Sequence, residues 1–163
     1  MPNYYDQRTS TLKTIYDRIE SACRKHRGIA QFDCGDLDTF GDNYKYPLVY
    51  LETINHFEEN ERKNGETFSI ALNIIDRSDE NELDRESMIA SHDRLKQLFT
   101  ELKMYLSQDR KPYAFGRGSV SPASVLVFNR FEPAALYRLR GEFTVTVDMV
   151  MTDTADLDII FEA

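Results

Sequence analysis

The sequence predicts an α+β fold: a four-stranded, mainly antiparallel sheet with an N-terminal helix and one long central helix packed on one face. Three observations predict it. Residues 10–27 and 83–106 repeat apolar side chains at helical spacing, residues 68–74 and 141–151 alternate apolar with polar side chains, and turn-forming residues separate these segments. Along the chain the order is helix, two strands, long helix, two strands. We expect the two amphipathic helices to cover the apolar faces of the strands.

The first predicted helix spans residues 10–27, and a polar connection rich in Asp and Gly follows at residues 33–46. Thr9 or Ser10 can cap the helix, and Gly28 can end it. Its apolar stripe is formed by residues three or four apart: Leu12, Ile15, Ile19, Ala22 and Cys23.

Residues 47–52, PLVYLE, are predicted to form a short strand with proline at its first position, where a missing N–H group is tolerated. Residues 58–65 are highly charged and end in Asn-Gly, a turn signal, so we expect a loop there. A half-buried strand follows and forms a hairpin with the first. One of its faces carries Phe68, Ile70, Leu72 and Ile74, and the other carries Thr67, Ser69, Ala71 and Asn73.

The longest predicted helix spans Leu83–Leu106, and an irregular segment rich in Gly and Pro follows at residues 107–123. The apolar stripe of this helix comprises Met88, His92, Leu95, Phe99, Leu102 and Leu106, widened by Leu98 and Tyr105.

Two more strands are predicted after the long helix, at residues 124–131 and 141–151. Residues 132–140 form either a connection or part of a strand. Residues 157–163, LDIIFEA, are apolar enough to dock against another surface.

Composition limits the possible functions. The chain has 163 residues, a size that fits one domain, so we expect residues 1–163 to form a single domain with N-terminal and C-terminal extensions. The net charge of −8 disfavours binding to nucleic acid through phosphate neutralisation. No signal peptide or membrane-spanning run is evident, and two cysteines are too few for a disulfide framework. These features are typical of a soluble protein made in a reducing cytosol.

An acidic turn between the second strand and the long helix is the first candidate site. It contains Asp76, Asp79, Glu80, Glu82 and Asp84. Such a cluster could bind a divalent cation, but acids also gather at helix N-termini because they interact favourably with the helix dipole and cap free N–H groups. Asp79 and Glu82 have the spacing of a capping box. The pattern lacks the glycine and the closing glutamate of a calcium loop, so we favour capping.

Other candidates are also explained more simply by structure. Asp33, Asp36, Asp38 and Asp42 lack the ligand series of a calcium loop, and Cys23, His26 and Cys34 lack the second ligand pair of a structural zinc site. His92 lies on an apolar stripe and is expected to be packed or to face a partner. The glycine-rich Gly116–Ser119 lacks the Lys-Ser/Thr of a phosphate loop. We therefore predict no enzyme activity, no catalytic or cofactor-binding residues and no metal site.

The order of elements resembles that of a known family. The residues that carry the resemblance are YPLVYLE (residues 46–52), the strand FSIALNIIDRS that passes through the acidic turn into a long helix, and the closing GEFTVTVDMVM strand. Over residues 10–151 this pattern is similar to bacteriophage tail-terminator and tail-completion proteins, the small α+β subunits of head-to-tail connectors. The closest similarity is to structural proteins of phages of gut Bacteroidetes, including the crAss-like group.

The resemblance implies a non-enzymatic virion protein at the neck or tail, made in the host cytoplasm. Such a subunit forms a homo-oligomeric ring, of six or twelve copies, through heterologous contacts. It contacts portal, neck or tail proteins, binds no membrane, and lets DNA pass through its lumen without sequence-specific contact. Its exact role as terminator, adaptor or stopper stays open. The alternatives are a small cytosolic interaction module without enzymatic activity and, less favoured, a metal-dependent enzyme using residues 76–84.

Overall fold

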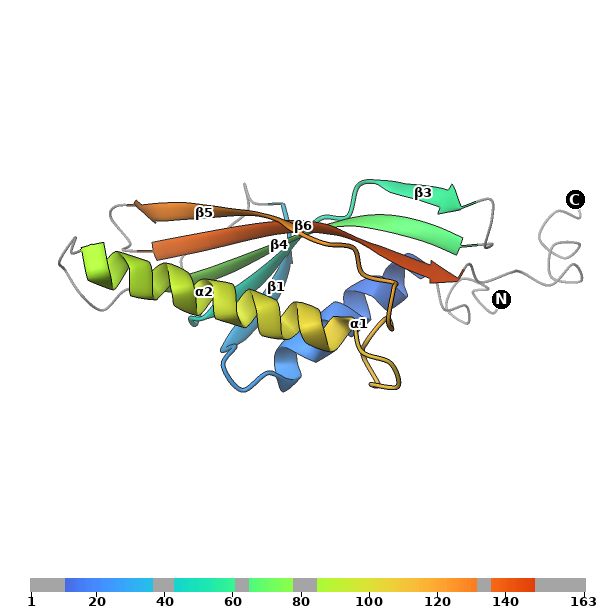
Figure 1. Cartoon of the computed structure of the whole chain (residues 1–163), viewed down its shortest axis with the longest axis horizontal. Coiled ribbons are helices and arrows are strands. Elements are labelled where there is room, and N and C mark those ends of the chain that lie inside the picture. Colours follow the sequence, from blue (N-terminus) through green and yellow to red (C-terminus); the bar gives the residue numbers. More distant parts are fainter. Residues whose placement is uncertain (1–10, 37–42, 61–64, 78–84, 132–135, 149–163) are drawn as a thin grey trace, which may run out of the picture.

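The computed structural model describes residues 11–36, 43–60, 65–77, 85–131 and 136–148. The fold is α+β, as predicted (Figure 1). Its elements are α1 (Thr11–Lys25), β1 (Gln31–Gly35), β2 (Leu48–Glu52), β3 (Phe57–Asn60), β4 (Gly65–Arg77), α2 (Arg85–Leu106), β5 (Ser124–Phe131) and β6 (Leu136–Asp148).

The strands of the described ranges form one six-stranded mixed sheet. Its order is β1-β2-β4-β6-β5, and β3 pairs with the first part of β4. β1 runs parallel to β2, whereas all other pairs are antiparallel. The prediction of four strands was therefore wrong in number, and the sheet contains a parallel pair that was not predicted.

The two additional strands lie in segments that were expected to be loops. β1 falls in part within the predicted connection 33–46, and it forms because its backbone pairs with β2 from Gln31–Leu48 to Gly35–Glu52. β3 falls within the predicted loop 58–65 and pairs with the start of β4. Three of its four residues are exposed, which explains its charged sequence, since edge strands are commonly protected by charge.

β6 starts at Leu136, so residues 136–140, for which both a connection and part of a strand were open, belong to the strand. It pairs with β4 over its whole length, from Arg77–Leu136 to Gly65–Asp148. This long ladder gives residues 136–140 backbone partners that their local sequence does not reveal. Residues 149–151 of the predicted strand lie outside the described residues.

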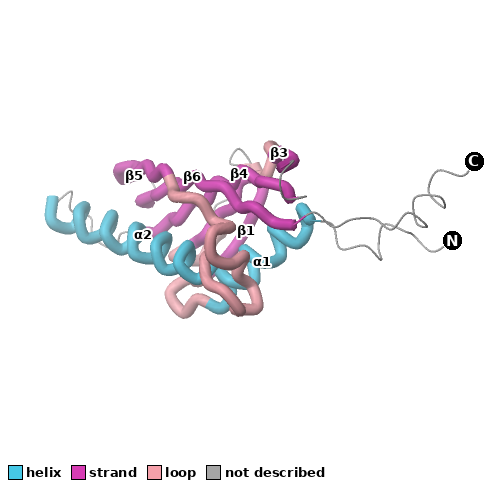
Figure 2. Tube along the Cα trace, turned by 45° about the vertical axis from the view of Figure 1, so that its right-hand side comes forward, coloured by secondary structure: helices cyan, strands magenta, loops and turns pink. Residues whose placement is uncertain are grey.

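Both helices lie on the same side of the sheet, as predicted (Figures 1 and 2). The periodic stripes of both helices are buried against the strands. In α1 the fully buried side chains are Ile15, Ile19 and Cys23; in α2 the buried set is Leu95, Leu98, Phe99, Leu102 and Leu106. They pack on the predicted apolar face of β4 and on Val49, Leu51, Leu139, Phe143 and Val145.

The opposite face of the sheet carries a smaller apolar cluster beside polar residues. Leu48, Tyr50, Ile75 and Leu136 form this cluster, with Tyr44 and Tyr46 packed against it. Asn73, predicted to lie on the exposed face of its strand, is fully buried. The helices therefore provide the main core on one face, while the other face is covered locally by aromatic side chains.

Candidate functional site: an apolar groove between α2 and β5

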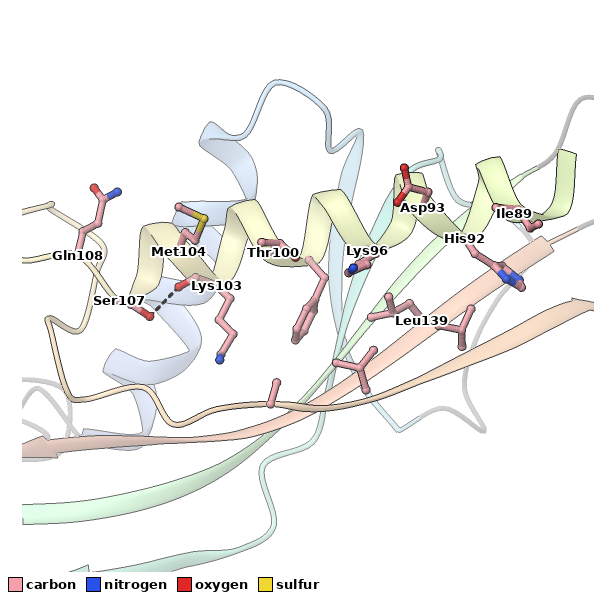
Figure 3. A pocket seen from close by; sticks show the side chains of 14 residues that line it. Ile89, His92, Asp93, Lys96, Thr100, Lys103, Met104, Ser107, Gln108 and Leu139 are labelled. Carbon is pink, nitrogen blue, oxygen red and sulfur yellow. Dashed lines mark hydrogen bonds between the residues drawn. The ribbon is translucent and has the colours of Figure 1, made fainter. Parts of the chain in front are cut away.

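A groove with a volume of about 780 Å³ runs between α2 and β5, and we call it the α2–β5 groove (Figure 3). α2 lines one wall with residues from Ile89 to Met104, and Ser107 and Gln108 follow at its C-terminal end. The opposite wall and floor come from Ala123, Val125 and Val127, with Leu139 of β6. The groove thus lies at the border between the helix layer and one edge of the sheet.

The strand wall is apolar and exposed. Val125 is 41% exposed and Val127 is 44% exposed, although both lie on the helix-covered side of the sheet beside their β6 partners Gly141 and Leu139. Leu139 itself is fully buried, because α2 covers β6. β5 lies one strand further out, and α2 leaves its valines accessible.

The helix wall is equally open. Ile89 is 51% exposed and Met104 is 62% exposed, since both lie beside the buried stripe of α2 rather than within it. Together with Val125 and Val127 they contribute exposed apolar side chains to one groove. Soluble proteins usually expose large apolar side chains singly, and several that gather in one groove favour an interaction surface.

A few polar groups border this lining. Lys96 and Lys103 of α2 line the groove together with Asp93, and the side chain of Lys103 extends from the helix toward the sheet (Figure 3). The ring of His92 packs edge-on against Tyr137, with centroids 5.6 Å apart. Its Nε2 atom is buried and has no hydrogen-bond partner among the described residues. The hydroxyl of Ser107 donates to the carbonyl oxygen of Lys103 at 2.8 Å, so it is already satisfied.

The chemistry of this groove favours binding over catalysis. Its walls offer dispersion contacts and burial of apolar surface, at about 25 cal/mol per Å² removed from water. A small-molecule site normally encloses its ligand, whereas Ile89 and Met104 on one wall and the two valines of β5 on the other are about half exposed. An extended or helical segment of protein fits such an open trough.

A charged cluster on the other face of the sheet is structural. The Nε of Arg140 donates to Glu52 at 2.6 Å, and the amide of Asn73 donates to the same carboxylate at 2.8 Å. Burial alone would raise the pKa of Glu52, but the hydrogen bonds from Arg140 and Asn73 outweigh it and lower that pKa. The carboxylate raises the pKa of Arg140 in return. Glu52 thus links β2 to Asn73 of β4 and Arg140 of β6, while Oδ1 of Asn73 is buried without a hydrogen-bond partner among the described residues.

Of the predicted acidic turn, Asp76 alone falls within the described residues; the acids at positions 79, 80, 82 and 84 do not. Asp76 is 7% exposed, and its carboxylate accepts the backbone N–H of Arg77 at 2.8 Å. Its other oxygen lies 2.5 Å from a guanidinium nitrogen of Arg94 in α2. Asp76 thus joins the end of β4 to the helix through an ion pair.

The second acidic group is used locally. Asp33 accepts hydrogen bonds from the hydroxyl of Tyr44 at 2.5 Å and from the N–H of Cys34 at 2.8 Å, and Asp36 accepts one from Thr53 at 2.8 Å. Asp38 and Asp42 lie outside the described residues.

The cysteine and histidine candidates do not come together as ligands. Cys23 is buried in the core, and burial raises its pKa to about 12, with Glu20 adding to the effect. His26 pairs with Glu101 of α2 at 2.7 Å, while Cys34 is exposed on β1. Within the described ranges, no group of three or more His, Cys, Asp or Glu side chains is placed to hold a metal ion.

The remaining segment with a candidate motif, Gly116–Ser119, forms a turn. Gly116 and Gly118 have φ values of 100° and 79°, a backbone conformation that favours glycine. The N–H of Arg117 donates to Asp109 at 2.8 Å. None of the described helices is long and apolar enough to span a membrane.

Comparisons with known proteins give a similarity in structure but none in sequence. No protein-family profile matches the sequence, and no curated protein matches it. Among solved structures, a chain from the virion of a native gene transfer agent particle superposes with a TM-score of 0.43 and 12% sequence identity. The match covers 85% of this chain and 94% of that chain. The function proposed below rests on the residues of this chain.

The sequence contained a signal for the groove that periodicity alone does not reveal. In SVLVFNRF, Val125, Leu126 and Val127 are consecutive apolar residues, which is typical of a strand covered on both faces. The structure instead places them on an edge strand, with Leu126 59% exposed on the other face of the sheet. An uncovered strand with this composition is an exposed apolar surface, which is typical of interaction sites.

Proposed function

We propose that this chain is a non-enzymatic structural subunit of a phage virion, which assembles into a homo-oligomeric ring at the head-to-tail junction. The observation that carries the proposal is the α2–β5 groove with the apolar edge of β5 beside it. Burying these side chains requires a second surface, because α2 leaves them exposed. A subunit of a ring obtains such a surface from its neighbour.

The resemblance in element order to tail-terminator and tail-completion proteins favours a ring at the head-to-tail junction. In that place the subunit contacts portal, neck or tail proteins, and DNA passes through the lumen. The net charge of −8 suits a channel from which DNA must be released, since like charge prevents capture of phosphates.

The first experiment measures assembly of the purified full chain by light scattering over a wide concentration range, followed by electron microscopy. We expect a closed ring, either alone or on a template of tail or portal proteins, and the same protein in purified particles. A strictly monomeric chain that is also absent from particles would refute the proposal. A defined complex with a non-virion partner would instead support the alternative, a cytosolic interaction module.

A pair of variants links assembly to the groove. Val127→Asp places a charge on the exposed strand wall, and we expect it to abolish assembly while the free energy of unfolding of the subunit stays within about 1 kcal/mol of wild type. Asn55→Asp adds the same charge at an exposed position outside the groove and should assemble normally. Equal assembly of both variants would show that the groove is not the contact.

A further inference from the structure

The segment after β6 has a sequence that matches the uncovered surface of β5. Residues 149–163 follow β6 and lie outside the described residues. Within them Leu157, Ile159 and Phe161 alternate with Asp158, Ile160 and Glu162. Such alternation is typical of a strand with one apolar face.

β5 offers an edge that can receive a strand. Within the described part of the chain, β5 pairs with β6 alone, so the N–H and C=O groups of its other edge are available. Addition of an extended peptide to an exposed edge is a recurring mode of recognition, in which backbone hydrogen bonds give affinity and alternate side chains give specificity.

The side chains of the two strands match face by face. Val125 and Val127 point to the groove, and Leu126 points to the opposite face of the sheet. A strand added beside β5 can place Leu157, Ile159 and Phe161 in the groove, where Ile89 and Met104 are exposed. Ile160 then lies on the same face as Leu126.

Charge also favours this segment. The groove is lined by Lys96 and Lys103 against a single acid, Asp93. Residues 152–163 contain the acids Asp153, Asp156, Asp158 and Glu162 and no Lys or Arg. An acidic segment is therefore attracted to the lysine-bearing wall, and the attraction weakens with salt.

From these matches we propose that residues 156–162 of one copy add as a strand to β5 of a neighbouring copy, with Leu157, Ile159 and Phe161 in its α2–β5 groove. The proposal deepens the ring proposed above and rests on it for the presence of a neighbour.

The backbone contacts of β6 favour exchange between copies over docking in the same chain. Leu139, in the groove, precedes Asp148 by nine residues, or roughly 30 Å of strand. Leu157 follows Asp148 by the same number, so a return to the level of Leu139 requires almost full extension after a reversal, whereas Val125 at the near end of the groove pairs with Gly141, seven residues before Asp148. The edge of β6 on that path is already occupied by the segment before β5. The backbone N–H of Ser121 donates to the carbonyl oxygen of Thr144 at 3.0 Å, and the N–H of Thr146 donates to the carbonyl oxygen of Ser119 at 2.8 Å.

The test is disulfide cross-linking between two full-length variants. One copy carries Val127→Cys and the other carries Ile159→Cys, both with Cys34→Ser to remove the exposed native thiol. After mixing and mild oxidation, we expect a band of dimer mass that neither variant gives alone and that decreases with added salt. The control replaces Val127→Cys by Glu59→Cys, at an exposed position on β3, and should give no such band.

A third variant carries both Val127→Cys and Ile159→Cys in one chain. A link within that chain at high dilution, without a link between mixed copies, would overturn the exchange. A mixed-copy yield no higher than with Glu59→Cys would overturn it as well.

These results are independent of the ring itself. If rings form but the cross-link does not, the proposed function is supported and the exchange of the C-terminal strand is refuted. If the cross-link forms between copies that never assemble into a ring, the exchange is supported and the proposed function is refuted.

Discussion

Gly141 of β6 lies against the ring of Phe99 from α2, and its substitution gives a sharp test of the packing. A Cβ atom at this position would lie 2.3 Å from both Cε2 and Cζ of the Phe99 ring. Ordinary carbon contacts are about 3.5–4.0 Å, so the ring has to withdraw by more than about 1 Å. Phe99 is a buried residue of α2, and its neighbours leave little room for that movement.

We expect Gly141→Ala to lower the free energy of unfolding by about 1–3 kcal/mol. Overpacking of a core costs about this much, and the gain of about 0.5–1 kcal/mol from replacing glycine in a strand offsets only part of it. Phe99→Leu alone should cost about 1–2 kcal/mol because it removes part of a buried ring. The double variant should cost less than the sum, by about 1–2 kcal/mol, since leucine leaves space for the new methyl group.

Urea denaturation followed by far-UV circular dichroism, at one protein concentration, measures all four corners of this cycle. Gly118→Ala is the matched control: no atom lies within 4 Å of its added Cβ, and its cost comes from a φ of 79° alone. It should therefore show no coupling to Phe99→Leu. A neutral Gly141→Ala, or costs that simply add in the double variant, would refute the close contact of ring and strand.

Three further predictions concern the polar and thiol groups. Asp76→Ala should lower the free energy of unfolding by about 1–2 kcal/mol through loss of its buried hydrogen bond and its pair with Arg94, while millimolar Mg²⁺ should leave the thermal midpoint of the wild type unchanged. Because folding lowers the pKa of Glu52, its carboxylate stabilises the protein at pH values above the ordinary pKa of 4.5. This stability is lost as the pH falls through the lowered pKa of the folded state, so Glu52→Gln should flatten that part of an acid unfolding curve. With a thiol reagent at mildly alkaline pH, Cys34 should react in the native protein and Cys23 only after denaturation; rapid native reaction of both would contradict the buried position of Cys23.

Much of the fold was predictable because its strongest elements carry their own pattern. The apolar stripe that ends at Leu106 predicted the bounds of α2 to within two residues, and the alternation from Phe68 to Ile74 predicted the central part of β4. β1 and β3 were missed for a physical reason: QFDCG alternates only two apolar residues with polar ones beside turn-forming Asp and Gly, FEEN has a single apolar residue, and pairing with β2 and β4 forms both strands. Tertiary pairing of this kind overrides local preference.

The groove was less accessible to sequence reasoning. The exposure of Val125, Val127 and Met104 depends on how far α2 reaches across the sheet, and no local pattern gives that distance. Sequence reasoning therefore concentrated on acids such as Asp76, whose structural role is an ion pair with Arg94. Consecutive apolar residues in β5 were the available signal, but their meaning required the strand order.

The edge strands β3 and β5 differ in a way that bears on assembly. β3 follows the usual protection of an edge strand, with Glu58 and Glu59 exposed on it, whereas β5 exposes Val125, Leu126 and Val127. An apolar edge left unprotected promotes aggregation unless a partner covers it. Because the two edges are unlike, they suit a contact between different patches of neighbouring copies, and such heterologous contacts close into rings when the rotation between copies allows it. The same difference disfavours pairing of the apolar β5 with the charged β3 of another copy. It favours an apolar segment as the partner that covers β5.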